Sequence, residues 1–125
     1  MKKITASILL IVIGLTMLQS CRHDPEGVDV QPKVCFTTQI KPIFETNCNM
    51  SGCHGEDAEK YDFRTTKGIL QGISPYKPFD SNIYEAITSP WSPMPPSPNS
   101  PLSKNQRTLI LLWISQGADT SSTCQ

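Results

Sequence analysis

One seven-residue stretch constrains this chain more than any other: residues 48–54, which read CNMSGCH. Two thiols and an imidazole lie within it, and His54 directly follows the second cysteine. A Cys pair followed at once by His is typical of covalent haem attachment, in which the thiols bind the vinyl groups and the imidazole ligates the iron. The usual spacing is C-x-x-C-H, whereas this stretch is C-x4-C-H. The small pair Ser51 and Gly52 can accommodate the extra length, because glycine tolerates unusual backbone angles.

The same residues allow two other interpretations. Cys48 and Cys53 could form a disulfide, or they could contribute to a zinc site with His54. Two cysteines and one histidine are too few for a closed structural zinc site, which makes zinc the weaker alternative.

The first 21 residues predict export and lipid attachment. Lys2 and Lys3 form a positive start, and residues 8–18 form an apolar run too short for a comfortable membrane span. The run ends in LQSC, which resembles a bacterial lipobox, so we expect a signal peptide at 1–20 and a lipid on Cys21. An ordinary secretory signal cut elsewhere is the alternative. The expected location is the periplasmic side or the outer surface of a bacterial membrane.

Residues 21–34 are polar, contain proline and glycine without periodicity, and are expected to form a flexible tether. The domain is then expected at 35–125 and to be mainly helical. Its first helix is predicted over 36–47, because apolar residues recur at helical spacing. A short helix ending at Gly72, another over 82–88 and a buried one after Ser103 should follow. The predicted caps are Thr37 or Thr38, Thr65 or Thr66, Ser81, and a capping box at Ser103 and Gln106.

Residues 90–101 hold six prolines, which exclude a helix or a central strand. A strong helix follows them, so they are expected to form a stiff loop inside the domain. Met94 lies in this loop between Pro93 and Pro95. Its thioether is a soft ligand suited to haem iron, and the loop could return to the face opposite His54. Met50 is a poorer candidate because it belongs to the attachment stretch itself.

Five cysteines are an odd number for an exported chain. With Cys21 bound to lipid and Cys48 and Cys53 to haem, Cys35 and Cys124 remain as a disulfide pair. Closing so long a loop would stabilise the fold by roughly 4–5 kcal/mol in the entropy model. A Cys48–Cys53 disulfide together with a Cys35–Cys124 disulfide also uses every remaining cysteine. The cysteine count therefore supports the Cys35–Cys124 disulfide better than it supports the haem.

The charge pattern of the chain excludes nucleic acid as an expected partner. The chain has 11 basic and 11 acidic residues, and no basic patch with interleaved aromatics that would indicate nucleic acid. His54 is the only histidine of the domain, and no Ser/His/Asp or paired-carboxylate arrangement offers a catalytic route.

Four segments together resemble the small monohaem c-type cytochrome domains, including their bacterial lipoprotein forms: KPIF at 41–44, the 48–54 stretch, MPP at 94–96 and WISQGA at 113–118. The resemblance covers about residues 35–118. It implies a small cytochrome-c-like fold with terminal helices packed around one covalent haem c. It also implies thioethers at Cys48 and Cys53, axial ligands at His54 and Met94, and haem packing by Trp113.

The function so implied is electron transfer between redox protein partners, with no catalytic activity of its own. Two alternatives remain: a haem-free, disulfide-stapled surface module for binding, and a haem enzyme or sensor with an open distal site.

Overall fold

The computed structural model describes residues 31–50, 52–55, 58 and 61–121. These residues are mainly helical, and none of them lies in a strand. The signal peptide predicted at 1–20, Cys21 and Cys124 lie outside the described residues. Within the described part, no helix has the length and apolar character needed to cross a membrane.

The first predicted helix is confirmed, with a different beginning. It opens as a π-helical segment, η2 (Phe36–Ile40), and continues as α2 (Lys41–Asn47). Phe36, Ile40, Ile43 and Phe44 are all buried, as their spacing predicts. The predicted threonine cap is wrong, because the N-cap is Cys35. The Cys35 backbone N–H donates instead to Gln39 Oε1 at 2.8 Å.

Two short helices and a 3-10 turn form the middle of the chain: α3 (Thr66–Leu70), η3 (Pro78–Asp80) and α4 (Asn82–Thr88). Thr65 caps α3 as predicted, its side chain accepting from Gly68 N at 2.9 Å. Ser81 is the N-cap residue of α4, as predicted, but its side chain makes no cap hydrogen bond. Its buried hydroxyl accepts from Ser74 N at 2.9 Å and donates to Lys77 O at 2.9 Å, so it closes the preceding turn.

The last helix, α5 (Lys104–Ser115), begins with the predicted capping box. Gln106 N donates to Ser103 Oγ at 3.2 Å, and Ser103 N donates to Gln106 Oε1 at 2.8 Å. Burial is less uniform than the apolar run predicts. Ile110, Trp113 and Ile114 form the buried face of this helix, while its other apolar residues are half-buried.

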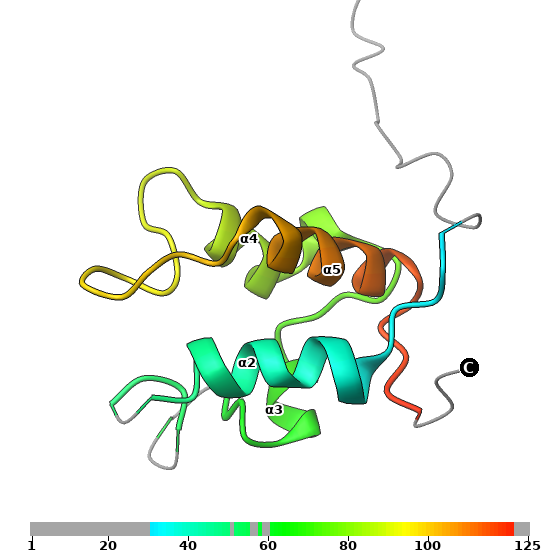
Figure 1. Ribbon diagram of the computed structural model, residues 1–125, viewed down its shortest axis with the longest axis horizontal. Helices are drawn as coiled ribbons and strands as arrows, with labels where there is room; N and C mark the ends of the chain where they lie inside the picture. Colours follow the sequence, from blue (N-terminus) through cyan, green and yellow to red (C-terminus); the bar gives the residue numbers. More distant parts are fainter. Residues whose placement is uncertain (1–30, 51, 56–57, 59–60, 122–125) are drawn as a thin grey trace, which may run out of the picture.

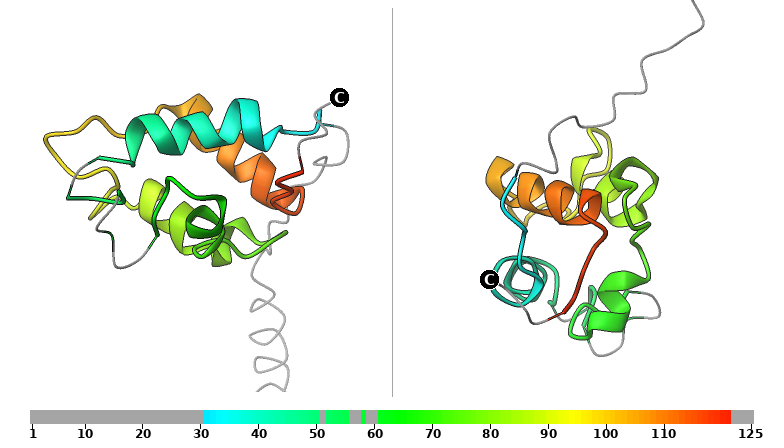
Figure 2. Two further views of the ribbon diagram at one scale, coloured as in Figure 1. Left: turned by 90° about the horizontal axis from the view of Figure 1, so that it is seen from below. Right: turned by 90° about the vertical axis from the view of Figure 1, so that its right-hand side faces the viewer.

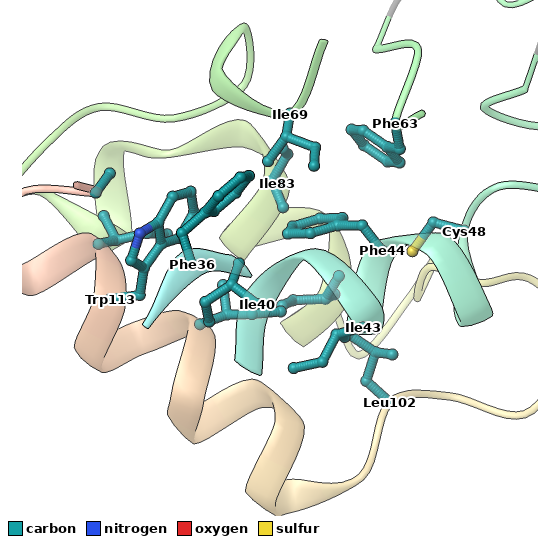
Figure 3. Close-up of a cluster of buried hydrophobic side chains, with 14 of the residues drawn as sticks. Phe36, Ile40, Ile43, Phe44, Cys48, Phe63, Ile69, Ile83, Leu102 and Trp113 are labelled. Atoms are coloured by element: carbon teal, nitrogen blue, oxygen red, sulfur yellow. The ribbon is translucent and has the colours of Figure 1, made fainter. Parts of the chain in front are cut away.

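Figures 1 and 2 show α2 and α3 on one side of the molecule and α4 and α5 on the other. The core lies between these pairs, and α5 packs against both η2 and α4. At the α5–η2 contact, the rings of Phe36 and Trp113 stack with centroids 5.5 Å apart. Figure 3 shows Trp113 at one end of the core cluster and Cys48 at the other.

The folded domain begins closer to the N-terminus than the sequence predicts. Val34 is buried, and its N–H donates to Gln116 Oε1 at 2.8 Å. Gln116 also donates to Pro32 O at 3.1 Å, and Lys33 forms an ion pair with Asp119 at 2.6 Å. The folded part therefore begins by residue 32 rather than 35. Figure 1 shows this segment and the end of α5 at the opposite end of the molecule from the loops that follow α2 and α4.

Candidate functional site

A cavity of about 340 Å³ lies where the loops after α2 and α4 come together. Its volume is at the lower end of the range of about 300–1,000 Å³ that is usual for small-molecule and cofactor sites. Most of its lining is apolar, and the cavity brings together residues that are far apart in the sequence. The described residues that line it are Phe44, Asn47, Cys48, Met50, Gly52, Cys53, His54, Tyr61, Phe63, Asn82, Ile83, Ala86, Ile87, Met94, Pro95 and Pro96.

The end of α2 fixes the first thiol. Cys48 is the C-cap residue of this helix, and its N–H donates to Phe44 O at 2.9 Å. The Cys48 side chain is buried next to Phe44, as Figure 3 shows, whereas Cys53 is exposed. Between them Gly52 has φ +78°, in the left-handed region that glycine adopts without strain. The prediction that glycine accommodates the longer spacing thus agrees with the backbone here, and Ser51 lies outside the described residues.

Aromatic rings position the imidazole. His54 O accepts from Phe63 N at 3.0 Å, so the loop after residue 54 returns to its starting point. The ring of Phe63 lies 4.5 Å from the His54 ring, centroid to centroid, and 5.0 Å from the ring of Phe44. These contacts connect His54 to the core through α2 and hold it, half-buried, against the cavity.

Met94 reaches the same cavity from the side of α4. Its N–H donates to Ala86 O in that helix at 3.0 Å, which fixes the backbone beside the cavity. Pro95 is buried, while the Met94 side chain retains 39% of its accessible surface. The segment 90–101 contains no helix or strand, as predicted, and returns to the domain.

The two thiols of the site are free and differ in their environment. Burial, and secondarily the charge of Cys53, raise the pKa of Cys48 to about 11, so this thiol is protonated at neutral pH. Cys35, by contrast, is disulfide-bonded. Its predicted partner, Cys124, lies outside the described residues, as does the lipidation site Cys21, so both assignments stay predictions.

The described residues contain no group of three His, Cys, Asp or Glu side chains arranged to hold a metal ion. Cys48, Cys53 and His54 therefore border the cavity without converging on one point, and the zinc interpretation gains no support. Thiols and an imidazole around an apolar space fit the donor set that a covalent haem needs, with the Met94 thioether contributed by the other loop.

Trp113, predicted to pack on a haem, is not part of the described cavity lining. It is fully buried against Phe36, and its Nε1–H donates to Asp119 O at 3.0 Å. Trp113 thus belongs to the contact between the first and last helices, and its packing on a haem stays a prediction.

Tyr61 and Asn82 are among the lining residues that the sequence analysis did not assign to the site. The local pattern gives no signal for them, because Tyr61 reads as one more apolar residue and Asn82 as a helix start. Only the return of the loop after residue 54 toward α4 brings them together.

Comparisons with protein-family models, with curated proteins and with solved structures found no match to this chain.

Proposed function

We propose that this protein is an electron carrier that holds one covalently attached haem c. Cys48 and Cys53 would bind its vinyl carbons, and His54 and Met94 would be the axial ligands. The observation that supports this most is the cavity itself, because all four side chains line one largely apolar space although Met94 is 40 positions beyond His54. The fold would accordingly be a small cytochrome-c-like arrangement.

The choice of ligands supports electron transfer over substrate chemistry. When bound, a haem supplies an iron that changes its charge by one electron. With His54 and Met94 both coordinated, no position stays open for a substrate. A methionine ligand and apolar surroundings both favour a higher reduction potential. Phe44, Phe63 and Ile83 provide such surroundings here.

The location and partners are part of the same proposal. A lipid on Cys21 would keep the exported domain at a bacterial membrane surface, where redox proteins would donate and accept the electron. The described residues carry no single charge block that dictates a strongly electrostatic docking mode.

The haem-free, disulfide-stapled module requires a Cys48–Cys53 bond, and no observation favours it because both thiols are free.

The haem enzyme or sensor with an open distal site differs from the proposal in one residue, Met94. Its partial exposure makes it the residue to test.

The experiment is a visible spectrum of the full chain, made in an exporting host with c-type maturation, together with haem staining on a denaturing gel. We expect a sharp low-spin reduced spectrum and haem that survives denaturation. Met94→Ala should abolish the low-spin spectrum and keep the covalent haem. Met50→Ala is the matched control, because Met50 lines the same cavity from the attachment loop and should leave the spectrum unchanged.

A colourless protein would overturn the whole proposal. Covalent haem with a spectrum unaffected by Met94→Ala would overturn the axial assignment and favour the open-site alternative.

A further inference from the structure

Besides Asn47, whose Nδ2 donates to Ile43 O at 2.8 Å, two polar side chains line the cavity and have no role in the function proposed above. Tyr61 and Asn82 both line it, and Asn82 Nδ2 donates to Tyr61 Oη at 3.1 Å. Asn82 is exposed and Tyr61 is half-buried, so the pair lies where the cavity meets solvent. The rest of the described lining is mostly apolar, which makes this pair a local concentration of hydrogen-bonding groups.

Tyr61 is held in place by several contacts. Its φ is +59°, a left-handed value that is uncommon for any residue other than glycine. Such conformations persist where the surroundings over-determine them, and they cluster at ligand sites. Here Gln71 Oε1 accepts from Tyr61 N at 3.3 Å, and the tyrosine ring lies beside Gly72, where a Cβ would meet first the Ile83 side chain and then this ring. The ring also stacks near Phe63, with centroids 6.1 Å apart.

The bond between the two residues leaves donors available. Because Tyr61 Oη accepts from Asn82, its own O–H is left to donate to another group. The Asn82 amide has a second N–H as well. No Lys or Arg is found among the described lining residues, so hydroxyl and amide donors are what the cavity offers to a negatively charged group. Hydrogen bonds from neutral donors to a carboxylate are charge-assisted and therefore strong.

We propose that Tyr61 and Asn82 bind a carboxylate of the prosthetic group at the mouth of the cavity and thereby orient it. This rests on the proposed function, since a haem carries two propionate side chains and is otherwise apolar. Tyr61 and Asn82 are positioning residues: they fix which edge of the group faces solvent, while Cys48, Cys53, His54 and Met94 hold it.

The test compares two tyrosines of the full chain. Tyr61→Phe removes the hydroxyl at the cavity, and Tyr76→Phe removes one elsewhere. Tyr76 is a close control, because it also has a left-handed φ, +65°, and also packs against a glycine, Gly117, but it is 73% exposed and does not line the cavity. The measurements are covalent haem content, the infrared redox-difference spectrum in the carboxylate region, and the midpoint potential.

We expect Tyr61→Phe to retain covalent haem, to shift the carboxylate band and to lower the midpoint potential. A carboxylate that has lost a donor keeps more of its negative charge, which favours the oxidised iron. The lost hydrogen bond changes the negative charge that the iron experiences from the carboxylate. We therefore expect the ratio of reduced to oxidised protein at a fixed potential to fall about two- to tenfold. For one electron this corresponds to about 20–60 mV. Tyr76→Phe should change neither the carboxylate band nor the midpoint potential.

Asn82→Ala should lower the potential in the same direction, and it serves as the second variant should Tyr61→Phe fold poorly. Haem-containing variants of Tyr61 and Asn82 with the wild-type band and potential would overturn this inference and leave the electron-carrier proposal intact. An equal shift in Tyr76→Phe would overturn it too. A wild-type chain without covalent haem would overturn both proposals.

Discussion

Replacing Phe44 by alanine should destabilise the fold by about 3–5 kcal/mol, the range typical of buried Phe→Ala changes. Phe44 is only 1% exposed and forms both the core and one wall of the cavity. Burial of its side chain contributes about 1.5–3 kcal/mol, and its ring pair with Phe63, at 5.0 Å, about 0.5–1.5 kcal/mol. The space left behind adds a further cost. Domains are stable by only about 5–15 kcal/mol in total, so this one change removes a large share.

The assay is urea unfolding followed by circular dichroism. With a slope of about 1.5 kcal/mol per molar, within the usual range, the midpoint should fall by about 2–3 M. Phe79→Ala is the matched control, because that phenylalanine is 66% exposed and touches Tyr84 edge-on at 5.7 Å. Its midpoint should fall by less than about 1 M. Equal shifts in the two variants would refute the idea that Phe44 joins the core to the cavity wall.

Two further predictions concern the periphery of the fold. The bond from Lys33, and secondarily two bonds from Ser121, lower the pKa of Asp119 to about 2. Its contribution to stability is therefore complete above the ordinary pKa near 4 and is lost as the pH falls through about 2. Asp119→Asn should make the melting temperature less dependent on pH between 4 and 2, whereas an unchanged dependence would contradict this assignment. Gly68→Ala should lower the melting temperature far more than Gly52→Ala. The new Cβ at Gly68 would clash with the backbone oxygen of Asp62, while at Gly52 it meets open space and costs only the strain of a positive φ, about 1–2 kcal/mol. Similar melting temperatures for the two glycine variants would show that residues 62–68 can move apart.

Local sequence signals predicted much of the helical framework. The range 82–88 coincides with α4, and the capping box at Ser103 and Gln106 forms as expected. The apolar spacing of the first helix identified its buried face correctly. These successes share a cause: helix starts and apolar faces are encoded within a few neighbouring residues.

The errors arose where distant segments compete with a local preference. Ser81 occupies the predicted N-cap position, but its hydroxyl bonds Ser74 and Lys77 in the preceding turn instead of the first turn of α4. The boundary of the tether was misplaced because Val34 is buried in the core and its N–H donates to Gln116, 82 positions later. Trp113 was expected to pack on a haem, whereas it lies outside the described cavity lining and stacks on Phe36.

In the candidate site, too, features encoded by neighbouring residues were predictable, whereas contacts between distant segments were not. The sequence motif identified Cys48, Cys53 and His54, and the prolines around Met94 identified a loop that returns to the domain. That all of them line one cavity was an expectation that the arrangement of the loops meets. Tyr61 and Asn82 could not be found in advance, because their proximity depends on how the loop after residue 54 lies against α4.

If Cys21 carries the proposed lipid, the contacts of Pro32, Lys33 and Val34 with the end of α5 have a mechanical consequence. The ten residues from 22 to 31 can span at most about 35 Å, so such an anchor would limit how far the domain moves from a membrane surface. Tension along that segment would load the ion pair of Lys33 with Asp119 and the two bonds of Gln116 first. These lie at the end of the molecule opposite the cavity (Figure 1), so the two loops that form the site would be shielded from the pull of the anchor.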